Sequence, residues 1–407
     1  MILDFLAAHR DAQTEMLAAL VRTPSDNPPG DMAPHAEVTA GLLETMGFSV
    51  ERHVVPASDT AAHGMISCTN LVVRHRFGPG PTIALNAHGD VVPPGDGWTA
   101  NPYGAEIRDG WMIGRGAAVS KSDIVTYAYA LAALRAAGQQ RGTVELHITY
   151  DEETGGEIGP AWLLTQGISK PDIALCAGFS YEVVEAHNGC LHLEVEITGR
   201  SAHAARPSTG IDALEAANSV LSALYGWRTA LADRVSAISG IGAPQLTVGL
   251  ISGGINTNVV PDRVVLRMDR RIVPDETPAA AEAELRAVIA SVDIAPAWAA
   301  IRRILLARPL TPTPAGAALT AIFCRHASAI MGTPVTAAGV PLYTDARHYA
   351  AAGIPVILYG AGPRSIEEAN AHRADERVRL DDLFRATEVV ALSLAEYFGR
   401  TDESSLA

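Results

Sequence analysis

Four short stretches of the sequence could do chemistry, because each places histidine, acidic or basic residues among small residues: NAHGDVVPPGDGW, GRGAAVSKS, TYDEETGG and ANAHRADERV. Each stretch alone is also typical of an ordinary surface turn. In the first and third, His88, Asp90, Glu152 and Glu153 end or directly follow short apolar runs that predict strands. Imidazole and carboxylate groups together bind Zn, Mn, Co or Fe. These residue types therefore favour a metal centre.

The elements that would position these residues belong to an alternation of strands and helices. NLVVRH, TIALNAH and TVELHITY predict strands, and residues 122–137 predict a helix that Gly138 ends. Strand, helix and strand in this order indicate a largely parallel sheet covered by helices. Ligands collect at the carboxyl ends of such strands, so we expect His88 and the Glu152–Glu153 pair to meet there. Asp90 is placed to accept the second ring N–H of His88 and fix its tautomer.

The pattern changes near Gly189. LHLEVEITG alternates apolar and polar residues, which predicts a half-buried antiparallel strand. The helix, two strands and helix that follow, up to residue 292, indicate a small sheet with helices on one face. For 407 residues, two domains are the first expectation. We therefore expect a catalytic α/β domain formed by residues 1–188 and 310–407, interrupted by an inserted α+β domain at residues 189–309.

Composition and charge narrow the class of protein. A net charge of −14 argues against a nucleic-acid partner, because phosphate binding depends on clustered lysine and arginine. The sequence has no apolar run of about twenty residues and no signal-peptide pattern at its start, so we expect no membrane span and a cytoplasmic location. The four cysteines lack metal-type spacing and are expected to be buried thiols in a reducing compartment.

The four stretches and their order resemble the M20 family of metal-dependent aminoacylases and peptidases, which includes acetylornithine deacetylase and succinyl-diaminopimelate desuccinylase. The resemblance extends over essentially the whole chain. It implies a Zn-peptidase-like catalytic domain with a mostly parallel mixed sheet, and an inserted ferredoxin-like lid domain. In the family the lid usually mediates dimerisation, so the resemblance also implies a homo-oligomer, at least a dimer.

The resemblance also implies roles for the residues of the motifs. AHGD makes His88 a metal ligand and Asp90 its orienting partner. DEE makes Glu152 the general base and Glu153 a metal ligand, and AHRADE makes His372 a further ligand.

Other motifs imply groups that hold the substrate. GRSAH makes His203 the group that reaches over the site, typically from the partner subunit, and GGINTNVVPD supplies Asn258. MDRR supplies Arg271 and YTDAR supplies Arg347, which by the resemblance bind the substrate and its carboxylate. An ordinary ion pair with a neighbouring aspartate is the alternative for each arginine.

Two positions depart from the family pattern. Val119 stands where the family has an aspartate that bridges two metals, and Ala177 falls where a further acidic ligand is usual. Both changes remove carboxylates. His88, Glu153 and His372 remain, and two histidines with one carboxylate are a known way to hold a single divalent metal, here Mn, Zn or Co. Three further residues are candidates to replace the missing ligands: Asp123, Asp172 and Ser180.

These assignments predict a metal-dependent hydrolase that cleaves a C–N bond of a small carboxylated substrate, with Glu152 accepting the proton of the attacking water. Because fewer metal ligands favour a substrate that needs less carbonyl polarisation, the specific expectation is hydrolytic deamination of an electron-poor arylamine such as 5-nitroanthranilate. An N-acyl amino acid amidohydrolase or a dipeptidase is the alternative. A catalytically inactive protein that binds a small molecule in the same cleft is the second alternative.

Overall fold

The computed structural model describes residues 1–400, and these divide into two compact units. The first unit comprises Met1–Glu185, Pro312–Ala338 and the chain from Thr344 onward. The second comprises Ala186–Thr311 and Gly339–Tyr343. The boundaries expected from the sequence, 188/189 and 309/310, fall a few residues from these divisions. The sequence did not indicate that Gly339–Tyr343 belongs with the second unit.

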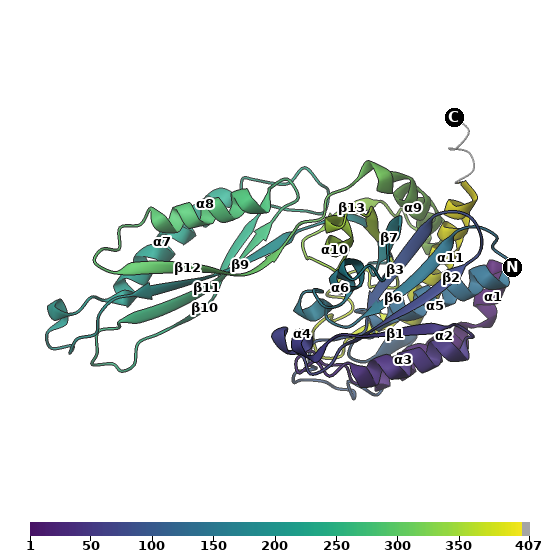
Figure 1. The fold of residues 1–407 in the computed structure, drawn as a ribbon, viewed down its shortest axis with the longest axis horizontal. Coiled ribbons are helices and arrows are strands. Elements are labelled where there is room, and N and C mark those ends of the chain that lie inside the picture. Colours follow the sequence, from purple (N-terminus) through teal and green to yellow (C-terminus); the bar gives the residue numbers. More distant parts are fainter. Residues whose placement is uncertain (401–407) are drawn as a thin grey trace. The chain divides into compact units, whose positions relative to one another are not determined.

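The first unit contains most of a large mixed sheet (Figure 1). In spatial order its strands are β1 (Val50–Val54), β2 (Thr69–Arg76), β6 (Thr143–Thr149), β3 (Thr82–His88), β7 (Ile173–Cys176), β14 (Val356–Leu358), β8 (Val183–His187) and β13 (Ala337–Val340). The centre is parallel, since β6, β3, β7 and β14 run in one direction. Antiparallel pairs flank it, namely β1 with β2, β2 with β6, and β14 with β8. The sheet confirms the α/β class predicted from the sequence.

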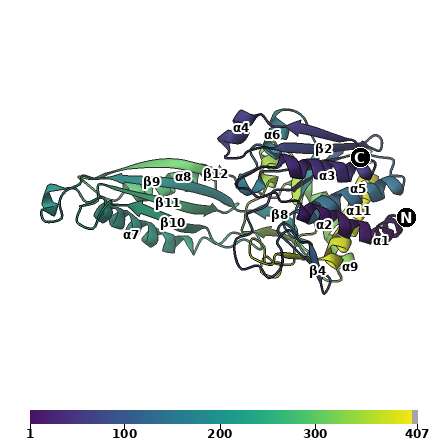
Figure 2. The ribbon, with the colours of Figure 1, turned by 90° about the horizontal axis from the view of Figure 1, so that it is seen from below.

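Helices pack along this sheet (Figures 1 and 2). They are α1 (Ile2–Ala8), α2 (Arg10–Arg22), α3 (Ala33–Thr45), α4 (Ala57–Ala62), α5 (Lys121–Ala136), α6 (Pro160–Thr165), α9 (Ala317–Met331), α10 (Ala346–Ala351) and α11 (Leu380–Arg400). A separate small sheet has the order β15 (Arg377–Arg379), β5 (Trp111–Ile113) and β4 (Glu106–Arg108). Among residues 1–400, no helix combines the length and the apolar character that crossing a bilayer requires.

The two faces of the large sheet differ in polarity. On β3, Leu85 and Ala87 enter the main apolar core together with residues of α5, which contacts β3 and β6. Alternate side chains of a strand point to opposite faces, so His88 lies on the other face. On that face the ring of His147 contacts the hydroxyl of Tyr349, from α10, at 2.7 Å. The catalytic candidates therefore belong to the polar side of the sheet.

Helix α5 is buried along almost its whole length. Gly138, with a φ of 72°, follows it in the left-handed conformation expected of a glycine that ends a helix. Asp123 in the first turn is buried as well, and its Oδ1 accepts the N–H of Ala361 at 2.6 Å. Burial raises the pKa of Asp123 to about 7.

The second unit is built on a smaller antiparallel sheet. Its strands, in order, are β10 (Gln245–Gly253), β11 (Arg263–Ile272), β9 (Gly189–Thr198) and β12 (Trp298–Ala307). Helices α7 (Ala213–Leu231) and α8 (Pro278–Ala290) share one apolar core with alternate residues of β9 such as Leu191 and Leu193. The helices thus cover one face, as predicted. Strand β12 was not predicted, because this edge strand is largely exposed and lacks a clear apolar alternation.

Replacing Asp123 by asparagine should change how stability depends on pH. An aspartate whose pKa is higher in the folded chain stabilises the fold below its unfolded pKa, and this contribution is lost as the pH rises through the folded value. For Asp123 that window runs from 3.8 to about 7. We expect the melting temperature of Asp123→Asn, relative to wild type, to rise across this window in metal-free buffer.

The matched control is Ser122→Ala on the same buried turn, which removes no titratable group. Its offset in melting temperature from the wild type should not vary with pH. A pH-independent offset for Asp123→Asn as well would contradict the raised pKa.

Candidate active site

His88 and the Glu152–Glu153 pair lie at one edge of the large sheet. His88 is the last residue of β3 and is in register with Thr149, the last residue of β6. Beyond Thr149 the chain enters a short 3₁₀ helix, Glu152–Thr154. Nε2 of His88 lies 3.9 Å from Oε2 of Glu152. Potential ligand atoms of His88, Glu152 and Glu153 all lie within 4.8 Å of one another, so the structure brings the three side chains together.

The carboxylate of Asp90 holds these groups in place. It is fully buried, and its oxygens accept the backbone N–H groups of Glu152 at 3.3 Å and Glu153 at 3.1 Å. Nδ1 of His88 lies 3.4 Å from the carboxylate and 3.0 Å from the Asp90 carbonyl oxygen. The side-chain amide of Asn27 donates to the carboxylate at 3.2 Å. One buried charge thus fixes both the imidazole and the turn that carries the two glutamates.

His372 approaches the glutamates from the C-terminal part of the chain. Its Nε2 lies 3.2 Å from Oε1 of Glu153, and its side chain is half exposed. His372 has a φ of 61° and Asp375 a φ of 55°, so the loop is tightly turned. The carboxylate of Asp375 accepts the N–H and hydroxyl of Thr99, both at 2.9 Å, which ties the loop to the segment after β3. The structure thus brings His372 to Glu153, whereas the group of ligand atoms within 4.8 Å of one another consists of His88, Glu152 and Glu153.

Burial and mutual charge shift the titration of this cluster. Burial raises the pKa of Glu152 to about 7; the charge of His88 opposes this shift and the charge of Glu153 adds to it. Burial by itself lowers the pKa of His88, but the hydrogen bond with Asp90 and the charge of Glu152 raise it well above its usual value. The hydrogen bond with Glu153 raises the pKa of His372. The cluster therefore attracts positive charge and contains a carboxyl group that exchanges its proton near neutral pH.

The turn that carries Val119 lies directly against His88. Oγ of Ser120 is 3.3 Å from both the backbone N and the backbone O of His88. Oε1 of Glu376 accepts the N–H of Val119 at 3.2 Å, and Oε2 accepts from Arg115 at 2.6 Å, both side chains being buried. The Val119 side chain packs against the apolar core. The turn thus carries the apolar side chain of Val119 at the position where the family resemblance implies a carboxylate.

Ala177 follows β7 at the same edge of the sheet. Its N–H donates to the carbonyl of Asn86 at 2.8 Å, so this position also brings a methyl group and no oxygen ligand. Asp172 lies at the opposite edge, where it accepts the N–H of Thr82 at 2.8 Å. Thr82 is at the other end of β3, about 20 Å from His88 along the strand. The expectation that Asp172 could replace a missing ligand is therefore wrong.

Ser180 and Asp123 are engaged with the segment that follows β14. The hydroxyl of Ser180 donates to the carbonyl of Gly362 at 2.8 Å, and the carboxyl of Asp123 accepts from Ala361. Among residues 1–400, the group of His, Cys, Asp and Glu ligands found at this edge does not include Asp123. Their contacts favour an anchoring role for the segment rather than the replacement of a metal ligand.

Polar residues of α10 hold the turn after the two glutamates. The carbonyl of Gly155 accepts from the guanidinium of Arg347 and lies 2.9 Å from Nε2 of His348. Gly156 has a φ of 71°, and a Cβ at this position would overlap the carboxyl of Asp345, so the turn requires glycine. Arg347 is buried in these contacts. Its guanidinium also lies 3.6 Å from Oε1 of Glu157, so the contacts favour a structural role for Arg347 that includes an ion pair.

The candidate residues of the second unit fall at opposite ends of its sheet. The carbonyl of Asn258 accepts the N–H of Ala204 at 2.9 Å, so Asn258 and His203 lie in facing loops. These loops adjoin the end of β9 at Thr198. Arg271 is in register with Cys190 near the start of β9, about 26 Å away along the strand. Within one chain, the structure brings His203 and Asn258 together and keeps both apart from Arg271.

Three residues of the site were not singled out as candidates from the sequence. Asn27 binds Asp90, and Glu376 binds the turn of Val119. Asp345 is buried near Glu152; burial, and then the charge of Glu152, raise its pKa well above the usual value. Glu376 lies in the ANAHRADERV stretch, which gave a signal. Asp345 lies in the YTDAR stretch, where it was considered only as an ion-pair partner of Arg347. Asn27 follows no local pattern, since its partner is distant in the chain.

Replacing Asp90 by asparagine should loosen the cluster. The amide carries no charge for the His88 ring, and its NH₂ group faces backbone N–H groups that need an acceptor. We expect Asp90→Asn to lower the affinity for a divalent metal roughly 10–100-fold, as is usual when a ligand loses its orienting partner. Calorimetric titration with Zn²⁺ or Mn²⁺ measures this. Asp96→Asn, at an exposed position of the same loop, is the control, and equal affinities in the two variants would contradict the role of Asp90.

Comparison with known proteins supplies independent information on this site. Residues 84–396 match the model of peptidase family M20/M25/M40. The chain is 29% identical to a succinyl-diaminopimelate desuccinylase of Rhizorhabdus wittichii, over 93% of this chain and 95% of that protein. It is 31% identical to an acetylornithine deacetylase of Pectobacterium carotovorum, over 65% of this chain and 68% of that protein.

The fold is similar to that of the YXEP protein of Bacillus subtilis, described as a dinuclear metal-binding peptidase from the M20 family. The TM-score is 0.69 at 15% identity, over 97% of this chain and 99% of that chain. These findings confirm the resemblance that the motifs carry. The chain belongs to peptidase family M20, and it is a metal-dependent hydrolase of amide bonds.

Proposed function

We propose that this protein removes the acyl group from a small N-acylated amino acid that carries a free carboxylate. The observation that carries the proposal is the position of Glu152, whose Oε2 lies 3.9 Å from Nε2 of His88 and beside the ligand atoms of Glu153. Amide hydrolysis by activated water requires a base of this kind next to a metal.

The donors at this edge fit one divalent metal. Two imidazoles, from His88 and His372, and the carboxylate of Glu153 are a donor set that transition metals accept with coordination positions left open. Val119 and Ala177 add no oxygen ligand, which supports a single metal rather than two. We infer that Mn, Zn or Co is held by His88, Glu153 and His372. When bound, such a metal supplies a Lewis acid that polarises the carbonyl and lowers the pKa of water.

Glu152 is the residue that moves protons in this proposal. Its carboxylate takes a proton from the attacking water while the new C–O bond forms at the amide carbon. The carboxyl group then gives this proton to the amide nitrogen, and the C–N bond breaks to release a carboxylic acid and an amine. Asp90 supports both steps, because its bond to the Glu152 N–H keeps the glutamate beside His88.

Substrate recognition is assigned to the second unit. His203 and Asn258 are proposed to donate hydrogen bonds to the negative charge that develops on the carbonyl oxygen. Nε of Arg271 lies 3.1 Å from Oδ1 of Asp269, which is the ion pair stated above as the alternative for this arginine. The other N–H groups of the guanidinium are proposed to bind the substrate carboxylate, for which a guanidinium is well suited. His203 and Arg271 lie at opposite ends of one sheet, which supports the inference that two chains of a homodimer contribute to each site.

The relatives favour an acyl amide over an arylamine. The two described above are named for desuccinylation and deacetylation. Neither supports the expectation of 5-nitroanthranilate, which was based on the reduced number of metal ligands. A single Lewis acid with a well-placed base also suffices, in principle, for an amide.

Replacing Glu152 by glutamine tests the proposal. The variant keeps the shape of the side chain but cannot accept the proton, so turnover should fall about 10²–10⁴-fold. Wild type and Glu152→Gln are assayed with Mn²⁺, Zn²⁺ or Co²⁺ against N-succinyl and N-acetyl amino acids and against anthranilate-type amines. Metal content is measured for both proteins, so that loss of metal is not mistaken for loss of the base.

Turnover of N-acyl amino acids that disappears in Glu152→Gln supports the proposal. If only the arylamines are hydrolysed, the substrate is an arylamine and not an N-acyl amino acid. If Glu152→Gln keeps full activity, Glu152 is not the base. If no substrate is turned over while a carboxylated ligand raises the melting temperature, the protein is a binding protein instead.

The single-metal inference predicts that a carboxylate restored at Val119 changes the metal content. Cys190→Ser serves as the background for this test, because Cys190 belongs to a second group of potential metal ligands. The side chain of Val119→Asp enters a turn that already lies against His88, so we expect a second Zn²⁺ or Mn²⁺ ion at this edge of the sheet, or clearly tighter binding of the first. Val119→Asn has nearly the same shape without the charge and should behave as wild type. Two tightly held ions at this edge in the wild type, counted by native mass spectrometry of a Cys190→Ser background, would contradict the inference.

A further inference from the structure

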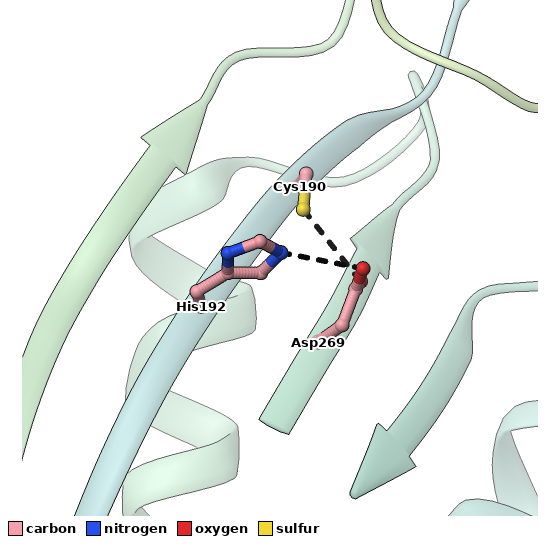
Figure 3. A group of neighbouring side chains, drawn as sticks. All are labelled: Cys190, His192 and Asp269. Carbon is pink, nitrogen blue, oxygen red and sulfur yellow. Dashed lines mark hydrogen bonds and ion pairs between the residues drawn. The ribbon is translucent and has the colours of Figure 1, made fainter. Parts of the chain in front are cut away.

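A second group of potential metal ligands lies on the sheet of the second unit (Figure 3). Cys190 and His192 are two residues apart on β9, and Asp269 on β11 is in register with His192. Because side chains alternate along a strand, all three project from one face of the sheet and point toward one another (Figure 3). The neighbouring Leu191 and Leu193 face the helices, so the group stands on the face opposite α7 and α8.

The polar atoms of this group converge on the Asp269 carboxylate. Sγ of Cys190 lies 3.6 Å from Oδ1, and Nε2 of His192 lies 3.3 Å from Oδ2. One ligand atom from each residue lies within 4.8 Å of the others. Cys190 is buried, whereas the side chains of His192 and Asp269 are 36% and 29% exposed. Solvent and dissolved ions can therefore reach the group from one side.

The order of these contacts argues against a nucleophilic cysteine. In cysteine hydrolases the histidine lies between the thiol and the acid, so that it can take the thiol proton. Here the carboxylate of Asp269 lies between Cys190 and His192. The thiol therefore contacts a carboxylate rather than an imidazole, and Nε of Arg271 lies 3.1 Å from the same oxygen, Oδ1 of Asp269.

We propose that Cys190, His192 and Asp269 form a binding site for one zinc-like divalent cation. On binding, the Cys190 thiol releases its proton to solvent and coordinates as thiolate. His192 coordinates through Nε2 as the neutral ring, with its proton on Nδ1, and Asp269 contributes Oδ2. Water from the exposed side completes the four positions that Zn²⁺ prefers. Arg271 remains on Oδ1, as the hydrogen-bond partner that commonly orients a ligating carboxylate.

The thiolate separates this site from the cluster around His88. Thiolate ligands favour Zn²⁺ and similar soft or borderline cations, whereas carboxylate-rich sites also accept Mn²⁺ and Mg²⁺. Cys190 and Asp269 are 79 residues apart, so no short spacing in the sequence marks the site. The antiparallel register of β9 and β11 creates it.

Co²⁺ is the probe that tests the proposal on the full chain, because thiolate ligation gives Co²⁺ a charge-transfer absorption that nitrogen and oxygen ligands do not give. Wild type and Cys324→Ser, which removes a thiol on α9, should show this band, and its amplitude should saturate at one thiolate-bound Co²⁺ per chain, in addition to any Co²⁺ held around His88. Cys190→Ser should lack it. In His192→Ala the affinity for the Co²⁺ ion that gives this band should fall more than roughly 10–100-fold. A decrease of roughly 10–100-fold is what loss of a residue that only orients a ligand causes, whereas His192 is proposed to be a ligand itself.

Zinc counting by native mass spectrometry is the independent measurement. Wild type and Cys324→Ser should hold one more Zn²⁺ per chain than Cys190→Ser. Absence of the Co²⁺ band in the wild type, or its persistence in Cys190→Ser, would overturn the proposal. If Cys190→Ser does not fold, His192→Ala decides, because its side chain is partly exposed and an unchanged Co²⁺ affinity there excludes the site.

Discussion

The buried carboxylate of Asp90 is the interaction on which the candidate active site depends. A buried charge is tolerated only when donors surround it. Here the N–H groups of Glu152 and Glu153, the amide of Asn27 and the ring of His88 do so. Satisfying this one charge fixes the histidine and the glutamate turn relative to each other, and the parallel register of β3 and β6 brings both to the same edge of the sheet.

The buried carboxylate of Glu376 explains how the site can lack the carboxylate ligand at position 119 and retain its conformation. Glu376 accepts from the turn of Val119 and pairs with Arg115, and His372 lies four residues before it. Breaking a buried ion pair typically costs about 3–5 kcal/mol, so the turn and the loop of His372 are held independently of any metal. A valine is therefore accommodated in a turn whose family counterpart carries a metal ligand.

The two clusters of potential ligands in this chain differ in the chemistry they favour. Around His88 the donors are imidazoles and carboxylates, and a carboxyl group of raised pKa provides a base. Around Asp269 the donors include a thiol, and the carboxylate is bound by Arg271. The first arrangement suits hydrolysis with an exchangeable cation, and the second suits tight binding of a thiophilic cation without a base for catalysis.

The sequence by itself determined the elements and motifs whose signals are local. Apolar periodicity gave β3 with both of its ends, glycine marked the end of α5, and the strand-end motifs placed His88 beside Glu152 and Glu153. Only the tertiary structure decided which residues distant in the chain become neighbours. It removed Asp172 from the site and joined Cys190 to Asp269. Such contacts depend on strand register and on how strands are ordered in a sheet, and local periodicity encodes neither.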